Sequence, residues 1–336
     1  MKPFAKLAKA SKMTADGVTS ALGFGCMGIS SFYGEAMEED AAMKLLQTVY
    51  DNGCRHFDTA ELYSNEDPNK HNEKYLGRFL ATVPRDSFTV ATKYWPANNM
   101  SEYDRVKSHL QQSLDRLGLE YVDLYYSHRV PTLECGIAYV LSAKKLQEEG
   151  LIKAIGLSEV SGNWLKEIVT TTGVKIDAVQ QEWSLLSRSL EEELVPVCKE
   201  LDITIVAYSP LARNLLVQKL DAIPNDWRST NPRYQQLEQN KKFADQVHDI
   251  AEKMKCTPAQ LCLAWLFHKA GELGVSVVPI PGTTKPERAI GNIASTDIID
   301  MDQDDLKVLD AMAKDVVGDR YDEGFMGGLM EGQQQQ

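Results

Sequence analysis

Four polar side chains in the first half of the chain have the types that proton transfer to an oxygen requires. Asp58, Lys93 and His128 each end a short apolar run, and Tyr63 follows five residues after Asp58. A tyrosine with a pKa of about 10 is a weak acid at neutral pH, and a lysine ammonium within ~4–6 Å would lower that pKa. Asp58 would keep the ammonium charged, and a neutral His128 could donate a hydrogen bond to a carbonyl oxygen. This set predicts a site that protonates an oxygen as a carbonyl becomes an alcohol.

The elements that would carry these side chains recur along the chain. Eight short apolar or β-branched runs each end in a polar residue or glycine: ALGFG, CRHFD, SFTVATK, YVDLYYSH, IKAIGLS, IDAVQ, ITIVAYS and VSVVPIPG. Stretches with helical periodicity lie between them, at 39–52, 72–80, 103–117, 139–149, 163–172 and 190–201. Eight strand–helix units in about 260 residues predict an α/β fold, a (β/α)8 barrel of the TIM type, which typically needs ~250 residues. A doubly wound open sheet is the alternative.

The barrel explains why the four side chains would meet. The carboxyl ends of all strands lie on one face of such a barrel, and that face holds the active site. Considered alone, Lys93 could be an ordinary surface lysine, and His128 could be a core histidine whose nitrogens are hydrogen-bonded within the protein. Together with Asp58 they end three consecutive strand units, which unrelated structural roles do not predict.

The chain divides into one expected domain over residues 1–323 and an expected disordered tail over 324–336. A loop over 211–240, rich in Pro, Asn and Arg, should follow the seventh strand. A long loop on a compact domain is usually functional or disordered. The end of the chain is acidic, because residues 297–336 carry 11 acids and 3 bases, a net charge of −8 out of −12.

Composition excludes several classes of protein. The remaining residues 1–296 carry a net charge of only −4 and no basic footprint, so nucleic acid is not an expected partner. No apolar run reaches the ~18 residues of a membrane helix, so no membrane association is expected. The lysine-rich start lacks the apolar segment of a secretory signal, and organelle import stays open. Six scattered cysteines without a CxxC pair indicate a reducing compartment, and a cytoplasmic protein is expected.

Three motif-like patterns do not carry their usual function. Residues 23–28, GFGCMG, match the dinucleotide fingerprint GxGxxG, but no helical pattern opens at the third glycine. Residues 156–160, GLSEV, begin like a nucleophile elbow and lack its final glycine. Cys256, Cys262 and His268 fit no zinc spacing, so no metal is expected.

An ordered series of motifs resembles the aldo-keto reductases. It comprises FDTAELY (57–63), ATK (91–93), DLYYSH (123–128), IGLSE (155–159), QQEWS (180–184), AYSPLAR (207–213) and PIPGTTKPER (279–288). The resemblance covers nearly the whole chain. GFGCMG near the start, SHR after the fourth strand and NPRY in the late loop are similar to the branch of monomeric fungal, plant and bacterial reductases.

This resemblance implies a (β/α)8 barrel that binds NADPH and passes hydride to an aldehyde or ketone. Tyr63 would be the general acid, Lys93 and Asp58 would tune it, and His128 would orient the carbonyl. The residues that the resemblance assigns to the cofactor are Ser158 and Gln180 at the carboxamide, Tyr208 stacked on the nicotinamide, Ser209, Leu211 and Arg213 along the pyrophosphate, and Gly282, Thr283, Thr284, Lys285, Arg288 and Asn292 at the adenosine phosphate. A PGTTK turn before a helix also suits phosphate on physical grounds, and Lys285 with Arg288 would pair the 2′-phosphate of NADPH.

Two positions depart from the family pattern, and three aromatic residues are candidates for the substrate pocket. Glu159 replaces the Asn that many members carry after the serine, and Gly291 stands where an acid commonly precedes Asn292. The pocket candidates are Trp95, Tyr33 and Trp227. The expected protein is a monomer whose partner is a small-molecule carbonyl substrate.

Two alternatives come from other classes. A regulatory subunit could keep the fold, bind NADPH and turn over little substrate, although it would have no need of an acid such as Tyr63. A barrel lyase or isomerase acting on a phosphate substrate would leave Tyr63 with Lys93 unexplained.

Overall fold

The computed structural model describes residues 22–64, 66–297, 301–326 and 329–333. Eight parallel strands form one sheet in chain order, so each strand pairs with the next. The strands are β1 (Phe24–Gly25), β2 (His56–Asp58), β3 (Thr89–Tyr94), β4 (Val122–Ser127), β5 (Ile152–Ser158), β6 (Ala178–Glu182), β7 (Thr204–Tyr208) and β8 (Val277–Pro279). The Gly23 N–H, just before β1, donates a 2.9 Å hydrogen bond to the carbonyl of Pro279 in β8. The predicted (β/α)8 barrel is confirmed, with a strand at each of the eight runs.

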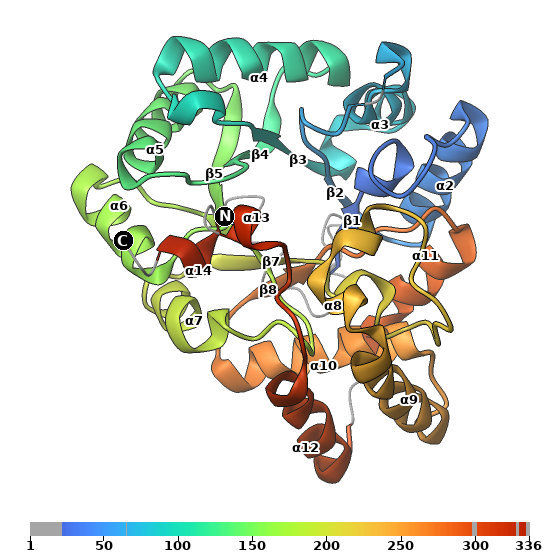
Figure 1. Cartoon of the computed structure of the whole chain (residues 1–336). Helices are drawn as coiled ribbons and strands as arrows, with labels where there is room; N and C mark the ends of the chain where they lie inside the picture. Colours follow the sequence, from blue (N-terminus) through green and yellow to red (C-terminus); the bar gives the residue numbers. More distant parts are fainter. Residues whose placement is uncertain (1–21, 65, 298–300, 327–328, 334–336) are drawn as a thin grey trace.

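A ring of helices surrounds the curled sheet (Figure 1). It comprises α2 (Glu39–Asp51), α3 (Asn72–Leu80), α4 (Tyr103–Leu117), α5 (Leu133–Glu148), α6 (Gly162–Thr172), α7 (Leu190–Glu200), α10 (Pro258–Leu273) and α11 (Pro286–Ile293). The fourth of these, α5, begins six residues before its predicted start at position 139. The Thr132 side chain caps it there by accepting a 3.1 Å hydrogen bond from the Cys135 N–H.

The period-2 alternation of the strands separates two cores and directs the site residues inward. The smaller core fills the barrel and consists of Ala91, Leu124, Tyr126, Ala154, Ala178, Val206, Val278 and Ile280. The larger core lies between the sheet and the helices. Residues two positions from barrel-core residues share their face of the strand, and Lys93, His128 and Gln180 lie at such positions. The pattern that fills the barrel therefore also places polar side chains at its carboxyl end.

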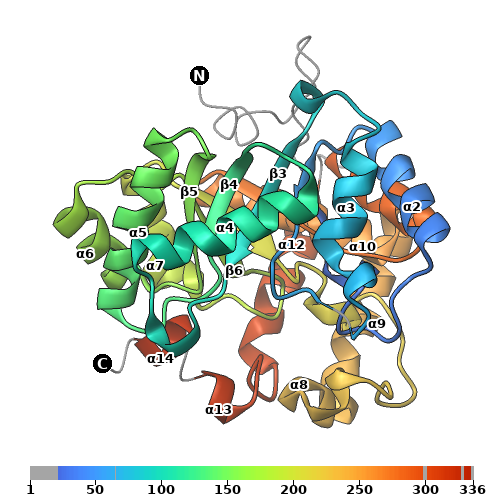
Figure 2. The same ribbon diagram turned by 90° about the horizontal axis from the view of Figure 1, so that it is seen from above.

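Two segments cover that end of the barrel. After β7 come short 3-10 turns at Ala212–Asn214 and Trp227–Thr230, then α8 (Pro232–Gln235) and α9 (Leu237–Lys253). The last part of the predicted loop over 211–240 is therefore helical, and α9 is held there because Leu237, Phe243 and Val247 are buried on one helical face. The second segment carries α12 (Gln303–Ala311), α13 (Glu323–Met326) and α14 (Met330–Gln333). Figure 2 shows α8, α13 and α14 at the same end of the molecule.

The described part of 324–336 contacts the barrel, and the disorder of this tail stays a prediction. Leu329 and Met330 are buried. The Gln333 side chain donates to the carbonyl oxygens of Val130 and Glu159 at 2.9 and 2.8 Å. These contacts satisfy two backbone carbonyls that follow the barrel strands β4 and β5. Residues 327–328 and 334–336 lie outside the described chain.

The seam between β1 and β8 depends on the absence of a side chain at Gly25. A Cβ built at this position lies 2.7 Å from the carbonyl oxygen of Ile280. We therefore expect Gly25→Ala to lower the free energy of unfolding by about 1–3 kcal/mol, the usual cost of overpacking. Urea denaturation measures the loss. Gly271→Ala on α10 is the matched control, because a Cβ there meets nothing within 4 Å. Equal stability of the two variants would contradict this account of the seam.

Candidate active site

Lys93, on the inner face of β3, lies at the centre of a buried polar cluster. Its Nζ is 2.5 Å from Asp58 Oδ1, 2.7 Å from the carbonyl oxygen of Thr59 and 3.5 Å from the Tyr63 hydroxyl. The Lys93 side chain is 0% exposed. Gln180 Nε2 in β6 donates a 2.8 Å hydrogen bond to the other oxygen of Asp58. The structure thus brings three predicted catalytic residues together, with Gln180 fixing the carboxylate from the opposite strand.

Burial decides the protonation states in this cluster. Burial raises the pKa of Tyr63 above its ordinary value, and the Lys93 ammonium opposes that rise only in part. From the sequence we expected Lys93 to lower the pKa of Tyr63, but the cost of burying a phenolate outweighs the effect of the ammonium. For Lys93, burial alone would lower the pKa, whereas Asp58 and Tyr63 together raise it above its ordinary value. At neutral pH Lys93 is a cation and Tyr63 is a protonated phenol, the form from which a proton can be donated.

His128, directly after β4, faces the same phenol. Its ring centroid is 5.8 Å from that of Tyr63, with the ring planes at 82°. The Trp95 ring packs edge-on against His128 at 5.5 Å. Burial lowers the pKa of His128 well below its usual range, so the imidazole is neutral. Tyr63 and His128 therefore lie side by side as two neutral groups, and each can form a hydrogen bond with a ligand.

A cavity of about 1110 Å³ opens above these residues at the carboxyl ends of the strands. Its lining includes nearly all the residues singled out in the sequence: Asp58, Tyr63 and His128; Ser158, Gln180, Tyr208, Ser209, Leu211 and Arg213; Gly282, Thr283, Thr284, Arg288 and Asn292; and Trp95, Tyr33 and Trp227. Lys93 lies beneath this lining. Lys285 is exposed and stands outside it.

Sequence comparison identifies the family to which this arrangement belongs. The sequence profile of the "Aldo/keto reductase family" matches residues 21–314. The chain belongs to the aldo/keto reductase family. A curated relative, "Probable aldo-keto reductase 1" of Glycine max, is 38% identical over 321 residues, covering 91% of this chain and 89% of that protein. Members of the family are NAD(P)-dependent oxidoreductases.

Solved structures of other family members share the fold. A thermostable aldo-keto reductase, Tm1743, solved with the inhibitor epalrestat, superposes with a TM-score of 0.72 at 27% identity, over 91% of this chain and 98% of that one. An aldo-keto reductase from Klebsiella pneumoniae in complex with NADPH gives a TM-score of 0.69 at 23% identity, over 93% of this chain and 99% of that one. The cofactor of the family is NADP(H), and the cavity of this reductase can be tested against it.

Two features of the cavity fit such a cofactor. Among the described residues, the buried Ser158 Oγ has no hydrogen-bond partner, so a ligand group in the cavity could satisfy it. At the other end, a Cβ on Gly282 would stand 2.6 Å from the carbonyl oxygen of Gly25. Glycine at 282 therefore lets the turn after β8 approach the backbone of Gly25 closely, and both glycines line the cavity without side chains that would fill it.

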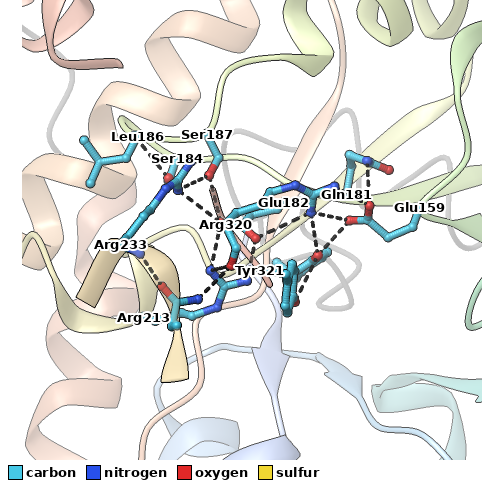
Figure 3. A network of polar contacts seen from close by, with 12 residues as sticks. Glu159, Gln181, Glu182, Ser184, Leu186, Ser187, Arg213, Arg233, Arg320 and Tyr321 are labelled. Carbon is cyan, nitrogen blue, oxygen red and sulfur yellow. Dashed lines mark hydrogen bonds and ion pairs between the residues drawn. The ribbon is translucent and has the colours of Figure 1, made fainter. Parts of the chain in front are cut away.

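Arg213 is held differently from the simple pyrophosphate contact that the family pattern implies. Its Nη2 is 2.6 Å from Glu182 Oε2 on β6, and its Nη1 is 3.3 Å from Oε1 (Figure 3). The backbone there is strained, because Ala212, Arg213 and Asn214 all have left-handed φ values of 47°, 55° and 79°. Glu182 thus fixes a strained turn of the loop after β7 against the barrel, and Arg213 lines the cavity from that turn.

The sequence analysis did not identify several residues of the site. Phe32, with φ of 70°, places its ring centroid 6.4 Å from that of Tyr63, with the two rings edge to face. Glu61 accepts a 2.5 Å hydrogen bond from the Trp95 backbone N–H, and so ties the turn that carries Tyr63 to the turn after β3. Tyr321, from the C-terminal segment, also lines the cavity. Of these residues, only Glu61 had a signal in the sequence. It belongs to the FDTAE motif and lies two residues before the candidate acid, so it had to lie in the same turn.

Two further searches covered only the described residues. Within 22–64, 66–297, 301–326 and 329–333, no group of three or more His, Cys, Asp or Glu side chains is placed to hold a metal ion. Over the same residues, every helix is too short or too polar to cross a bilayer.

Proposed function

We propose that this protein reduces an aldehyde or ketone to the alcohol with NADPH, and that Tyr63 donates the proton. The observation that carries the proposal is the contact of a protonated, buried Tyr63 with the Lys93 ammonium, beside a neutral His128, at the floor of the cavity. A regulatory cofactor-binding subunit would need the cavity but not this acid.

Each residue has a distinct part in the proposed reaction. The substrate oxygen would accept hydrogen bonds from His128 and from the Tyr63 hydroxyl, which orients the carbonyl and withdraws charge from its carbon. When bound, NADPH supplies the hydride that reduces this carbon. Tyr63 gives its proton to the oxygen as negative charge develops there, and Lys93 stabilises the resulting phenolate. Asp58 keeps Lys93 charged and in place through the 2.5 Å contact.

The cofactor would lie along the row of residues that starts at the strand ends and finishes on α11. Ser158 and Gln180 would hold the carboxamide, Tyr208 would stack on the nicotinamide, and the strained loop after β7 would follow the pyrophosphate. The α11 end provides the turn before Pro286, where backbone N–H groups favour phosphate. What supports this assignment is that one continuous cavity connects all these residues.

The substrate would enter between aromatic side chains. Trp95, Phe32 and Leu62 line the cavity near Tyr63, and Tyr33 packs edge-on against Trp227 at 5.8 Å. An apolar wall of this kind favours carbonyls with an apolar or aromatic body. All six cysteines are free thiols, which supports a cytoplasmic location.

NADPH oxidation by the purified protein, followed against a panel of aldehydes and ketones, tests the proposal. Cofactor binding is measured in parallel by quenching of intrinsic tryptophan fluorescence. Turnover of at least one carbonyl together with NADPH binding is the expected result. Tight NADPH binding with no turnover across the panel would favour the regulatory subunit instead.

Arg288 is expected to select NADPH over NADH. Its side chain is exposed and lines the cavity from α11, so it can pair with a 2′-phosphate. Because a charge-assisted hydrogen bond contributes about 1.5–3 kcal/mol, Arg288→Ala should weaken NADPH binding by about 10- to 100-fold and leave NADH binding within about twofold. Lys285→Ala should have a smaller effect, since Lys285 stands outside the cavity lining. Equal losses for both cofactors would contradict the 2′-phosphate role.

A further inference from the structure

Residue 159 carries a side chain that its backbone disfavours. Glu159 directly follows β5 and has a left-handed φ of 57°. Glycine and asparagine tolerate this conformation, whereas a long side chain does so at a cost. The Glu159 side chain is fully buried, which adds the cost of removing a carboxylate from water. Contacts made by the carboxylate must compensate for both.

The carboxylate accepts four hydrogen bonds from three side chains, which come from three parts of the chain. Arg320, from the C-terminal segment, donates from Nη1 to Oε1 at 2.9 Å and from Nη2 to Oε2 at 2.5 Å. Tyr208 donates its hydroxyl to Oε1 at 2.7 Å, and Gln181 Nε2 donates to Oε2 at 3.2 Å. Burial alone would raise the pKa of Glu159, but Arg320 overrides it and the pKa falls to about 2. Glu159 and Arg320 therefore form a bidentate ion pair, and both partners are charged at neutral pH.

The pair stands behind the cavity rather than in it. The described lining includes Tyr208 and Tyr321 but not Glu159 or Arg320. Arg320 Nη1 donates to the Tyr208 hydroxyl at 3.0 Å, so both members of the pair contact that hydroxyl. Tyr321 Oη lies 3.3 Å from the same oxygen. The contact to the cavity therefore runs through the two tyrosines.

Arg320 also joins the C-terminal segment to the strained loop after β7. Its carbonyl oxygen accepts hydrogen bonds from Arg213 Nη1 at 3.1 Å and from Asn231 Nδ2 at 2.7 Å. Its side chain is 4% exposed. The strand end at Glu159, the loop at Arg213 and the C-terminal segment thus meet at one residue.

From this geometry we propose that Glu159 and Arg320 are positioning residues for the cofactor. The ion pair fixes the Tyr208 ring through its hydroxyl and holds Tyr321 in the wall of the cavity. The nicotinamide surface is thereby set by the C-terminal segment as well as by the barrel. Glu159, which departs from the family's Asn, serves Tyr208 and Arg320 in place of a carboxamide contact. The inference rests on the proposed binding of NADPH along Tyr208.

The test compares Glu159→Gln, Arg320→Met, their double variant and Tyr208→Phe with the unaltered protein. Each single change at the ion pair should weaken NADPH binding by about tenfold or more and lower kcat further, because small displacements of a bound reactant can cost about 100-fold in rate. The double variant should bind no more weakly than the worse single variant, since the two residues act as one unit. Tyr208→Phe keeps the ion pair and loses only its connection to the ring, so about a three- to tenfold loss is expected.

Lys253→Met is the matched control for simple loosening of the C-terminal segment. Lys253 on α9 pairs with Asp305 on α12 at 2.9 Å, far along the chain from Tyr208. This variant should bind NADPH within about twofold of the unaltered protein. Fluorescence titrations are made well below the melting temperature of each variant, so lost stability does not mimic lost binding. Should a variant of the ion pair fail to fold, Tyr208→Phe still decides the case.

The outcomes separate this inference from the proposed function. Folded variants that bind and turn over NADPH like the unaltered protein would overturn the positioning role and leave the reductase intact. A loss in Lys253→Met equal to that in Arg320→Met would also overturn it. An unaltered protein that fails to bind NADPH would refute both the function and the inference.

Discussion

Tyr63→Phe is expected to lower kcat by about 10²–10⁴-fold, the usual contribution of a positioned general acid. The variant loses one hydroxyl, whose side-chain contact in the described structure is Lys93 Nζ at 3.5 Å. The ring and its packing against His128 and Phe32 are kept. Binding of NADPH should therefore stay within about twofold of the unaltered protein. Steady-state oxidation of NADPH measures kcat, and fluorescence quenching measures the dissociation constant.

Tyr50→Phe is the matched control for removal of a tyrosine hydroxyl. Its hydroxyl donates to Ser87 Oγ at 2.8 Å, away from the cavity. This variant should keep full turnover. If Tyr63→Phe also keeps turnover, the proton comes from another donor, and the proposed role of Tyr63 is wrong.

The pKa shifts predict the pH dependence of the same reaction. A general acid works while it is protonated, so the rate should fall only as pH rises through the pKa of Tyr63, which burial has raised above 10. His128 is neutral because burial lowers its pKa well below 6.5, so it adds no titration near neutrality. The rate of reduction should stay nearly constant between about pH 6 and about pH 9. A decline centred near pH 7 would show that another group controls the reaction.

The sequence predicted the barrel and the meeting of Asp58, Tyr63 and Lys93 because both follow from local regularities. Short apolar or β-branched runs ended in polar residues, and parallel strands bring such ends to one face. The α4 helix was also predictable to the residue, from its apolar spacing and from Gly118 in the left-handed conformation at its end. Even the missed α10 had a signal, since Thr257, Pro258 and Gln260 form a capping box with proline at the first position.

The remaining parts of the site depend on contacts between distant residues. Nothing in IGLSE indicates that Glu159 will bind Arg320, which is 161 positions away and had no role assigned from the sequence. The sign of the Tyr63 pKa shift likewise depends on how much burial outweighs one ammonium, and composition cannot give that balance. Gln180 was assigned to the cofactor, yet its amide also fixes Asp58. Such shared roles appear only once the barrel has closed.

Lys93→Met is expected to lower both kcat and stability strongly. Loss of the ammonium leaves the Asp58 carboxylate buried without its 2.5 Å partner, and breaking a buried pair on one side typically costs about 3–5 kcal/mol. The phenolate that forms during proton transfer also loses its counter-charge, so kcat should fall by about 10²-fold or more. Urea denaturation and NADPH oxidation measure the two effects separately.

A second substitution distinguishes the electrostatic role of Lys93 from its structural role. Asp58→Asn with Lys93→Met removes both charges, and the amide oxygen introduced at position 58 can still accept from Gln180 Nε2, as the carboxylate does at 2.8 Å. Because a buried ion pair can be replaced by neutral groups at little cost, most of the lost stability should return. Turnover should not return, since no cation remains beside Tyr63. Recovery of turnover together with stability would mean that Lys93 only holds the fold, and that the acid works without a neighbouring charge.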